Sequence, residues 1–217
     1  MLLLYRNNLA FRIPINFKMD FYYTIDRTGI AEYKDRGSKF LAYAFPLKNK
    51  EACKDHLLSL RKEHPKAAHY CFAYRIGYDG NNYRANDDGE PSGTAGKQIL
   101  SQIDSRNLSD VLVIVVRYFG GSLLGVPGLI AAYKTVTALV LQCSPIIQKT
   151  IEINYILQFN YTEMNEVMRI MKKYNCTLYK NELQLFCKIK AGFAKSRLPE
   201  VLLALGNIQN VEYTAVK

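Results

Sequence analysis

The sequence predicts an α+β protein built from two domains, and three observations carry that prediction. The chain has 217 residues, more than the roughly 100–150 residues of a common domain. Short apolar runs bounded by turn residues alternate with segments of helical periodicity. The alternation is interrupted at Ser144-Pro145, where a helical segment ends and a linker begins. We therefore expect a first domain over residues 19–145 and a second over residues 148–217.

The first domain is predicted to contain a sheet and helices. Residues 111–116 form a continuous β-branched and apolar run, typical of a strand buried on both faces, and we expect this strand at the centre of the sheet. Residues 129–143 are rich in Ala, Leu and Val, which predicts a largely buried helix. Alternation, helical spacing and turn residues add strands over 22–25, 40–47, 70–78 and near 83–84, and helices over 51–63 and 98–103.

The second domain has an element order of its own. Its periodicity switches between strand and helix in the order β-α-β-β-α-β, which is the split ferredoxin-like pattern. The expected strands cover 151–159, 176–179, 183–189 and 208–216, and the expected helices cover 163–174 and 197–205.

Composition limits the classes of function. Hydrophobic residues make up 49% and charged residues 22% of the chain, which argues against a disordered tail, a collagen and a membrane bundle. The formal net charge of +10 favours polyanionic partners such as nucleic acid or the ribosome. No lysine–arginine run is present, so any basic surface must be assembled by folding.

The cysteines and the N-terminus bear on localisation. The five cysteines are widely spaced without a C-x-x-C pair, so we expect neither a disulfide framework nor structural zinc, and a cytoplasmic location fits best. The apolar start at Leu2 is interrupted at Arg6, far short of a signal sequence or a membrane span, so we expect no membrane contact. Residues 1–18 are expected to be a flexible arm or an over-extended start.

The segment 87–97 is the most unusual part of the chain. Three acidic residues precede Ser-Gly-Thr-Ala-Gly-Lys at the start of a predicted helix, where free backbone N–H groups and Lys97 could receive an anion. It is not a Walker A loop, because Pro91 stands where glycine is needed and Gln98 where a hydroxyl should hold magnesium. The alternative is a turn in which Asp87 and Ser92 only cap backbone groups.

A second segment, Arg117-Tyr118-Phe119-Gly120-Gly121, follows the buried strand directly. A cation, aromatic rings and glycines at a strand end suit stacking on bases or phosphate recognition. The alternative is that the aromatic side chains plug the core edge while the glycines supply positive φ.

The histidines predict no metal site. His69 and Cys71 lie two residues apart on one strand face, as a thiol nucleophile and its base would, but no third orienting residue is identifiable and a packed structural pair is the simpler interpretation. His56 and His64 lack the spacing of zinc ligands. We expect no cofactor.

Three motifs carry a resemblance to a known family: residues 87–97, residues 115–121 and Leu124-Gly125-Val126-Pro127-Gly128-Leu129. Together with Ser38-Lys39-Phe40 and residues 69–74, they resemble the YigZ/IMPACT family over roughly residues 22–143. The remainder is similar to the additional C-terminal domain of bacterial members.

The resemblance implies a ribosomal protein S5 domain 2-like fold followed by a ferredoxin-like domain. The same pair of folds in the same order resembles the last two domains of elongation factor G, which is an analogy of fold alone. Eukaryotic members of the family regulate translation by competing for a ribosome-associated activator of a kinase. A role associated with translation is therefore implied.

The favoured hypothesis is a non-enzymatic protein whose two glycine-rich segments converge into one surface that engages RNA, the ribosome or a ribosome-associated protein. One alternative is a metal-assisted enzyme that acts on a small anionic or peptide substrate with the cluster of acidic residues. Another is binding through the open sheet face of the second domain. The residues expected to bind phosphate or nucleic acid are Asp87, Asp88, Gly89, Glu90, Ser92, Gly93, Thr94, Gly96, Lys97, Arg117, Tyr118, Gly120 and Gly121.

Overall fold

The computed structural model describes residues 20–182 and 185–216, which fall into two compact units. The first unit is Phe21–Ile151 and the second begins at Glu152. Both are mixed α/β, so the two-part α+β architecture predicted from the sequence is confirmed. The expectation for residues 1–18 lies outside the described residues.

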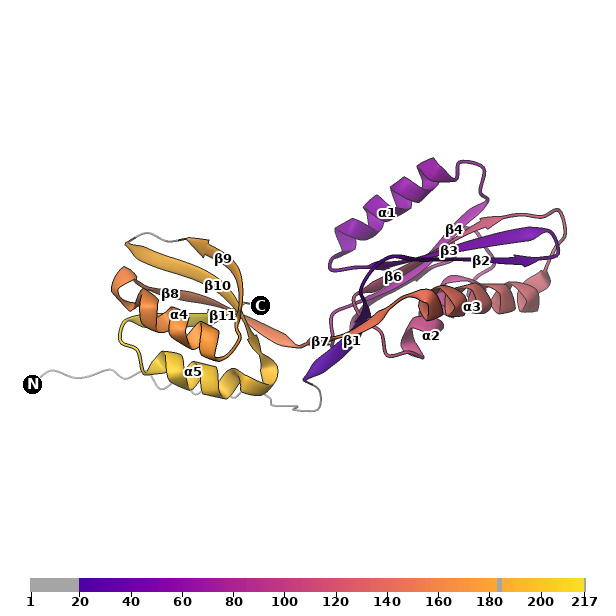
Figure 1. The fold of residues 1–217 in the computed structure, drawn as a ribbon. Coiled ribbons are helices and arrows are strands. Elements are labelled where there is room, and N and C mark those ends of the chain that lie inside the picture. The colour runs from indigo at the N-terminus through magenta and orange to yellow at the C-terminus, as the bar shows by residue number, and fades with distance from the viewer. Residues whose placement is uncertain (1–19, 183–184, 217) are drawn as a thin grey trace, which may run out of the picture. The chain divides into compact units, whose positions relative to one another are not determined.

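The first unit is built on a five-stranded antiparallel sheet in the order β2-β3-β6-β4-β5 (Figure 1). Its middle strand β6 (Val111–Tyr118) buries Val111, Val113 and Val115 on one face and Leu112, Ile114 and Val116 on the other, as predicted for a central strand. The other strands are β2 (Gly29–Asp35), β3 (Ser38–Pro46), β4 (His69–Ile76) and β5 (Asn82–Asn86).

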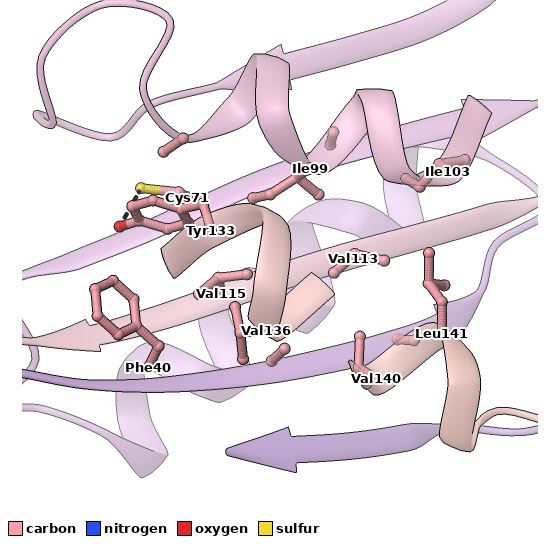
Figure 2. Packing of buried hydrophobic residues seen from close by; sticks show 14 of the residues in the cluster. Phe40, Cys71, Ile99, Ile103, Val113, Val115, Tyr133, Val136, Val140 and Leu141 are labelled. Carbon is pink, nitrogen blue, oxygen red and sulfur yellow. Dashed lines mark hydrogen bonds between the residues drawn. The ribbon is translucent and has the colours of Figure 1, made fainter. Parts of the chain in front are cut away.

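Helices cover both faces of this sheet. Helix α1 (Lys50–Glu63) lies on one face, and α2 (Gly96–Asp104) and α3 (Gly125–Cys143) lie on the other (Figure 1). In the core beneath α2 and α3, the ring of Tyr133 lies beside Phe40 and Cys71 (Figure 2). Helix α3 is long and apolar enough to cross a membrane by length and composition, but Leu129, Val136 and Val140 pack in this core.

Several elements differ from the prediction. Strand β2 was not predicted. It lies at an edge of the sheet, and after Gly29 its inward positions are only partly buried. Residues after Pro145, expected to be a linker, form β7 (Ile146–Thr150), which pairs with β1 (Phe21–Ile25). Helix α3 begins at Gly125, earlier than predicted, because Pro127 is tolerated in the first turn of a helix.

The second unit has the strand and helix order predicted from the sequence. Its antiparallel sheet has the order β11-β8-β10-β9, and helices α4 and α5 pack on one face through residues such as Val167 and Val201. The opposite face carries polar side chains. The elements are β8 (Glu152–Asn160), α4 (Met164–Lys173), β9 (Thr177–Glu182), β10 (Phe186–Ala194), α5 (Leu198–Gly206) and β11 (Val211–Ala215), with short 3-10 turns before each helix.

Candidate functional site

Asp87 holds the backbone at the start of α2. Its carboxylate accepts hydrogen bonds from the N–H groups of Gly93 (2.9 Å), Ala95 (3.0 Å) and Gly96 (2.8 Å). A side chain at Gly96 would place its Cβ 2.5 Å from the backbone nitrogen of Asn86, so this glycine is required by close packing. The N–H groups that could receive an external anion are therefore already bound to a carboxylate of the chain itself.

Asp88 joins the segment 87–97 to helix α1 and strand β4. Its carboxylate lies 2.9 Å and 3.0 Å from Nη2 of Arg61 and accepts the N–H of Tyr70 at 2.7 Å. The Arg61 guanidinium also stacks over the Tyr70 ring, 4.3 Å from its centroid. The backbone of Asp88 has φ 41°, and Gly89, at φ 88°, lies beside the ring of His69. Asp88 thus anchors this turn to helix α1 through Arg61 and to strand β4 through Tyr70.

The buried pair of Glu90 and Arg117 connects the two glycine-rich segments. Both residues are buried, and Nη1 of Arg117 lies 2.7 Å from Oε1 of Glu90. The Tyr133 hydroxyl donates to the same oxygen at 2.8 Å. Nη2 of Arg117 lies 3.4 Å from Oγ of Ser38, while Nε is buried without a hydrogen-bond partner. The sequence did not single out Tyr133, because it lies in an apolar helix with nothing in its local pattern to mark a polar role.

The network continues from Tyr133 to the proposed thiol–imidazole pair. Sγ of Cys71 lies 3.2 Å from the Tyr133 hydroxyl (Figure 2) and 2.9 Å from the Asp87 carbonyl oxygen. Nδ1 of His69 lies 2.8 Å from the carbonyl oxygen of Asp88 and donates to it. Burial raises the pKa of the Cys71 thiol and of the Tyr133 hydroxyl. Both side chains contact backbone carbonyl oxygens of the segment 87–97, so the pair holds this turn on strand β4.

Gly120 lets the β6–α3 loop approach the β2–β3 turn. A Cβ on Gly120 would lie 1.9 Å from the carbonyl carbon of Gly37, a collision with backbone. The N–H of Gly120 donates to the Ser38 hydroxyl at 3.2 Å. The same hydroxyl contacts Arg117, so the loop, the turn and the buried ion pair share one anchor.

The remaining predicted residues divide between packed and exposed positions. Thr94 is buried and donates its hydroxyl to the Pro91 carbonyl at 2.7 Å. The hydroxyl of half-buried Tyr118 lies 3.0 Å from Nδ1 of His64. Ser92, Lys97 and Gly121 are exposed.

The β6–α3 loop and the first turn of α3 expose three apolar side chains. Phe119 is 52% exposed, Leu123 84% and Val126 52%. The Phe119 ring lies over the Arg117 guanidinium, 5.7 Å from its carbon, so the buried pair supports the exposed ring. Apolar side chains within a glycine-rich loop were the signal in the sequence. Of these three residues the sequence analysis considered only Phe119, as an aromatic ring suited to stacking on bases or as a plug of the core edge.

The acidic cluster does not form a metal site. Within residues 20–182 and 185–216, no group of three or more His, Cys, Asp or Glu side chains is placed to hold a metal ion. The carboxylates of Asp87, Asp88 and Glu90 each face a different set of donors on the chain. Their oxygens are engaged by N–H, guanidinium and hydroxyl groups, so this arrangement does not favour metal-assisted catalysis.

The open sheet face of the second unit is hollowed and carries charges of both signs. A hollow of about 640 Å³ lies over it. One row across all four strands runs Glu212, Gln158, Lys188 and Glu182. Phe186, at 79% exposure, is the aromatic side chain that lines the hollow with its ring open to solvent. The adjacent row runs Thr214, Ile156, Lys190 and Lys180, and Tyr179, 54% exposed, lies beside Gly192. Mixed charges among polar side chains are typical of a solvated sheet face.

Comparison with known proteins places the chain in a family. The family model described as the Impact N-terminal domain matches residues 36–141, which include both glycine-rich segments. The chain is 31% identical over 165 residues to the IMPACT family member YigZ of Escherichia coli, covering 75% of this chain and 81% of that protein. It is 39% identical over 112 residues to YvyE of Bacillus subtilis, a match that spans 52% of each protein.

A solved structure resembles most of the chain as well. It is described as a crystal structure of a hypothetical protein, with a TM-score of 0.73 and 26% identity over 92% of this chain and 99% of that one. The chain belongs to the IMPACT family.

Proposed function

We propose that this chain is a non-enzymatic binding protein associated with translation, and that the surface built by its two glycine-rich segments contacts the ribosome or a component attached to it. In this proposal the first unit has the ribosomal protein S5 domain 2-like fold and the second the ferredoxin-like fold. Membership of the IMPACT family and a net charge of +10 support an association with ribosomal surfaces. The proposed location is the cytoplasm, which suits five cysteines without a disulfide.

One observation supports the proposal: the charged and polar side chains of the two segments bind other groups of the chain itself, while close packing and positive φ angles at glycines shape the adjoining loop. Asp87 binds backbone N–H groups, Glu90 and Arg117 bind each other, and burial, which raises the pKa of the Cys71 thiol, argues against a thiol nucleophile. Three glycines shape the adjoining loop, of which Gly120 meets backbone and Gly121 and Gly125 have positive φ. A fixed loop of this kind suits recognition better than catalysis.

Co-sedimentation with ribosomes tests the proposal. Crude ribosomes from Escherichia coli or Bacillus subtilis retain their associated proteins, and salt-washed ribosomes do not. We expect the chain to pellet with at least one of the two preparations in a saturable manner. The control is the same sedimentation with an unrelated basic protein of similar size. A chain that stays in the supernatant with both preparations contradicts a ribosomal role.

A further inference from the structure

We propose that the partner at this surface is a protein segment that presents apolar side chains next to carboxylates, and that Phe119, Leu123 and Val126 receive it. This inference rests on the proposed function and names the chemistry of its partner. RNA is the competing occupant of the same surface, and the structure favours protein for two reasons.

The first reason is that the groups suited to phosphate are occupied. The N–H groups of Gly93, Ala95 and Gly96 donate to Asp87, so a phosphate would have to displace a carboxylate of the chain. The Arg117 guanidinium is buried against Glu90 and covered by Phe119. Lys97 is the exposed cation of the segment 87–97, and one lysine does not hold an RNA backbone.

The second reason is the nature of the exposed side chains. Leu123 and Val126 are aliphatic and have no ring on which a base could stack. The Phe119 ring is already in contact with Arg117 on one side. Leu123, at 84% exposure, is nearly as accessible as in an unfolded chain, although its neighbour Leu124 is buried in the core. A fixed loop that exposes apolar side chains in this way is typical of protein recognition sites.

The charge beside the loop indicates which polar groups the protein segment carries next to its apolar side chains. The β2–β3 turn touches the loop at Gly120, and Nη2 of Arg36 lies 3.9 Å from the position of a Cβ on Gly128. The acidic residues of that hairpin are already within ion-pair distance of cations, Glu32 with Lys34 and Lys39, and Asp35 with Arg36. The cations therefore outnumber the acids at this edge, and a carboxylate on the partner complements the surplus.

Two surface substitutions with matched controls test the inference. Leu123→Ser removes an apolar contact, and Leu203→Ser in α5 is the control because Leu203 is 70% exposed in the other unit. Arg36→Glu reverses the charge beside the loop, and Arg27→Glu is the control at an exposed position between β1 and β2. Melting temperatures of all four variants within about 2 °C of wild type establish that they fold, since exposed side chains contribute little to stability.

The probes are crude ribosomes, salt-washed ribosomes and the RNA extracted from the latter by deproteinisation. We expect Leu123→Ser to weaken ribosome binding about 10-fold to 100-fold, the effect of withdrawing one buried leucine from a contact. Arg36→Glu should weaken it as well, and neither control should change it. Raising the salt from about 50 to 200 mM should cost about threefold for one ion pair, against about 10³-fold or more for a surface that contacts many phosphates.

The outcomes separate this inference from the function on which it rests. Ribosome binding that survives Leu123→Ser unchanged, or that the extracted RNA reproduces at equal affinity, overturns the protein segment and leaves the ribosomal role intact. Absence of binding to every ribosome preparation overturns both. Binding lost equally in Leu203→Ser and Leu123→Ser also overturns the inference, because the effect would then not belong to the loop.

Discussion

Two segments of the first unit, residues 87–97 and residues 119–126, are alike in composition and opposite in role. Both are rich in glycine, and both border strands of the same sheet. The first segment turns its carboxylates inward, where Asp87 binds three backbone N–H groups and Glu90 binds Arg117. The second turns Phe119 and Leu123 outward. The comparison teaches that glycine-rich composition marks a shaped backbone and does not say whether the shape serves packing or recognition.

The largest expected effect comes from breaking the inward segment at its centre. Arg117→Ala leaves the buried Glu90 carboxylate without its cation, which should lower the free energy of unfolding by about 3–5 kcal/mol. Urea denaturation measures the loss. In the double variant Arg117→Met with Glu90→Gln no charge remains buried, so part of the loss should return. An Arg117→Ala protein as stable as wild type would show that the pair is not structural.

The next effect compares adjacent glycines of the outward segment. Gly120→Ala should lower the free energy of unfolding by about 3 kcal/mol, because its Cβ collides with the backbone of Gly37 and Ser38. Gly121→Ala should cost only about 1–2 kcal/mol, because φ is 85° there but no atom lies within 4 Å of the added Cβ. Denaturation curves of the two variants supply the measurement. Equal losses would mean that the close approach of loop and turn is not required.

A smaller effect tests whether the inward segment is an anion site that the chain itself fills. Asp87→Asn keeps one acceptor oxygen but removes the charge opposite three N–H groups, which should cost about 2 kcal/mol of unfolding free energy. A second variant, Asp87→Ala, removes the side-chain acceptor altogether. Sulfate at tens of millimolar should raise the melting temperature of Asp87→Ala more than that of wild type, because the N–H groups are then free to bind the anion. An equal response of the two proteins would contradict this account of Asp87.

The smallest effect concerns pH. Burial raises the pKa of the Cys71 thiol above its ordinary value near 8.5, so the unfolded chain releases this proton first as the pH rises. The contribution of Cys71 is fully present below about pH 8.5 and is lost as the pH rises toward the folded pKa, by about 1–2 kcal/mol at pH 10. Denaturation at pH 8 and pH 10 should show a steeper decline for wild type than for Cys71→Ser, whose hydroxyl does not titrate there. Parallel declines would contradict a buried neutral thiol.

More of the fold than of the candidate site could be predicted from the sequence. The β-branched run of β6 and the periodicity of the second unit depend on local pattern, and both were predicted. Strand β7 was missed because pairing with β1, more than a hundred residues away in sequence, is what makes residues 146–150 a strand. Tyr133 was missed for the same reason, since its hydroxyl meets Glu90 only after α3 packs on the sheet.

By itself, the sequence determined the alternation of strands and helices, the division into two units and the glycine-rich segments, because hydrophobic period and backbone freedom are local properties. Only the tertiary structure decided which charges are neutralised. It paired Glu90 with Arg117 and closed Asp87 onto the start of α2, since those partners meet only when distant segments pack. The same packing left Leu123 exposed to water, because the exposure of a side chain depends on which other segments of the chain pack around it.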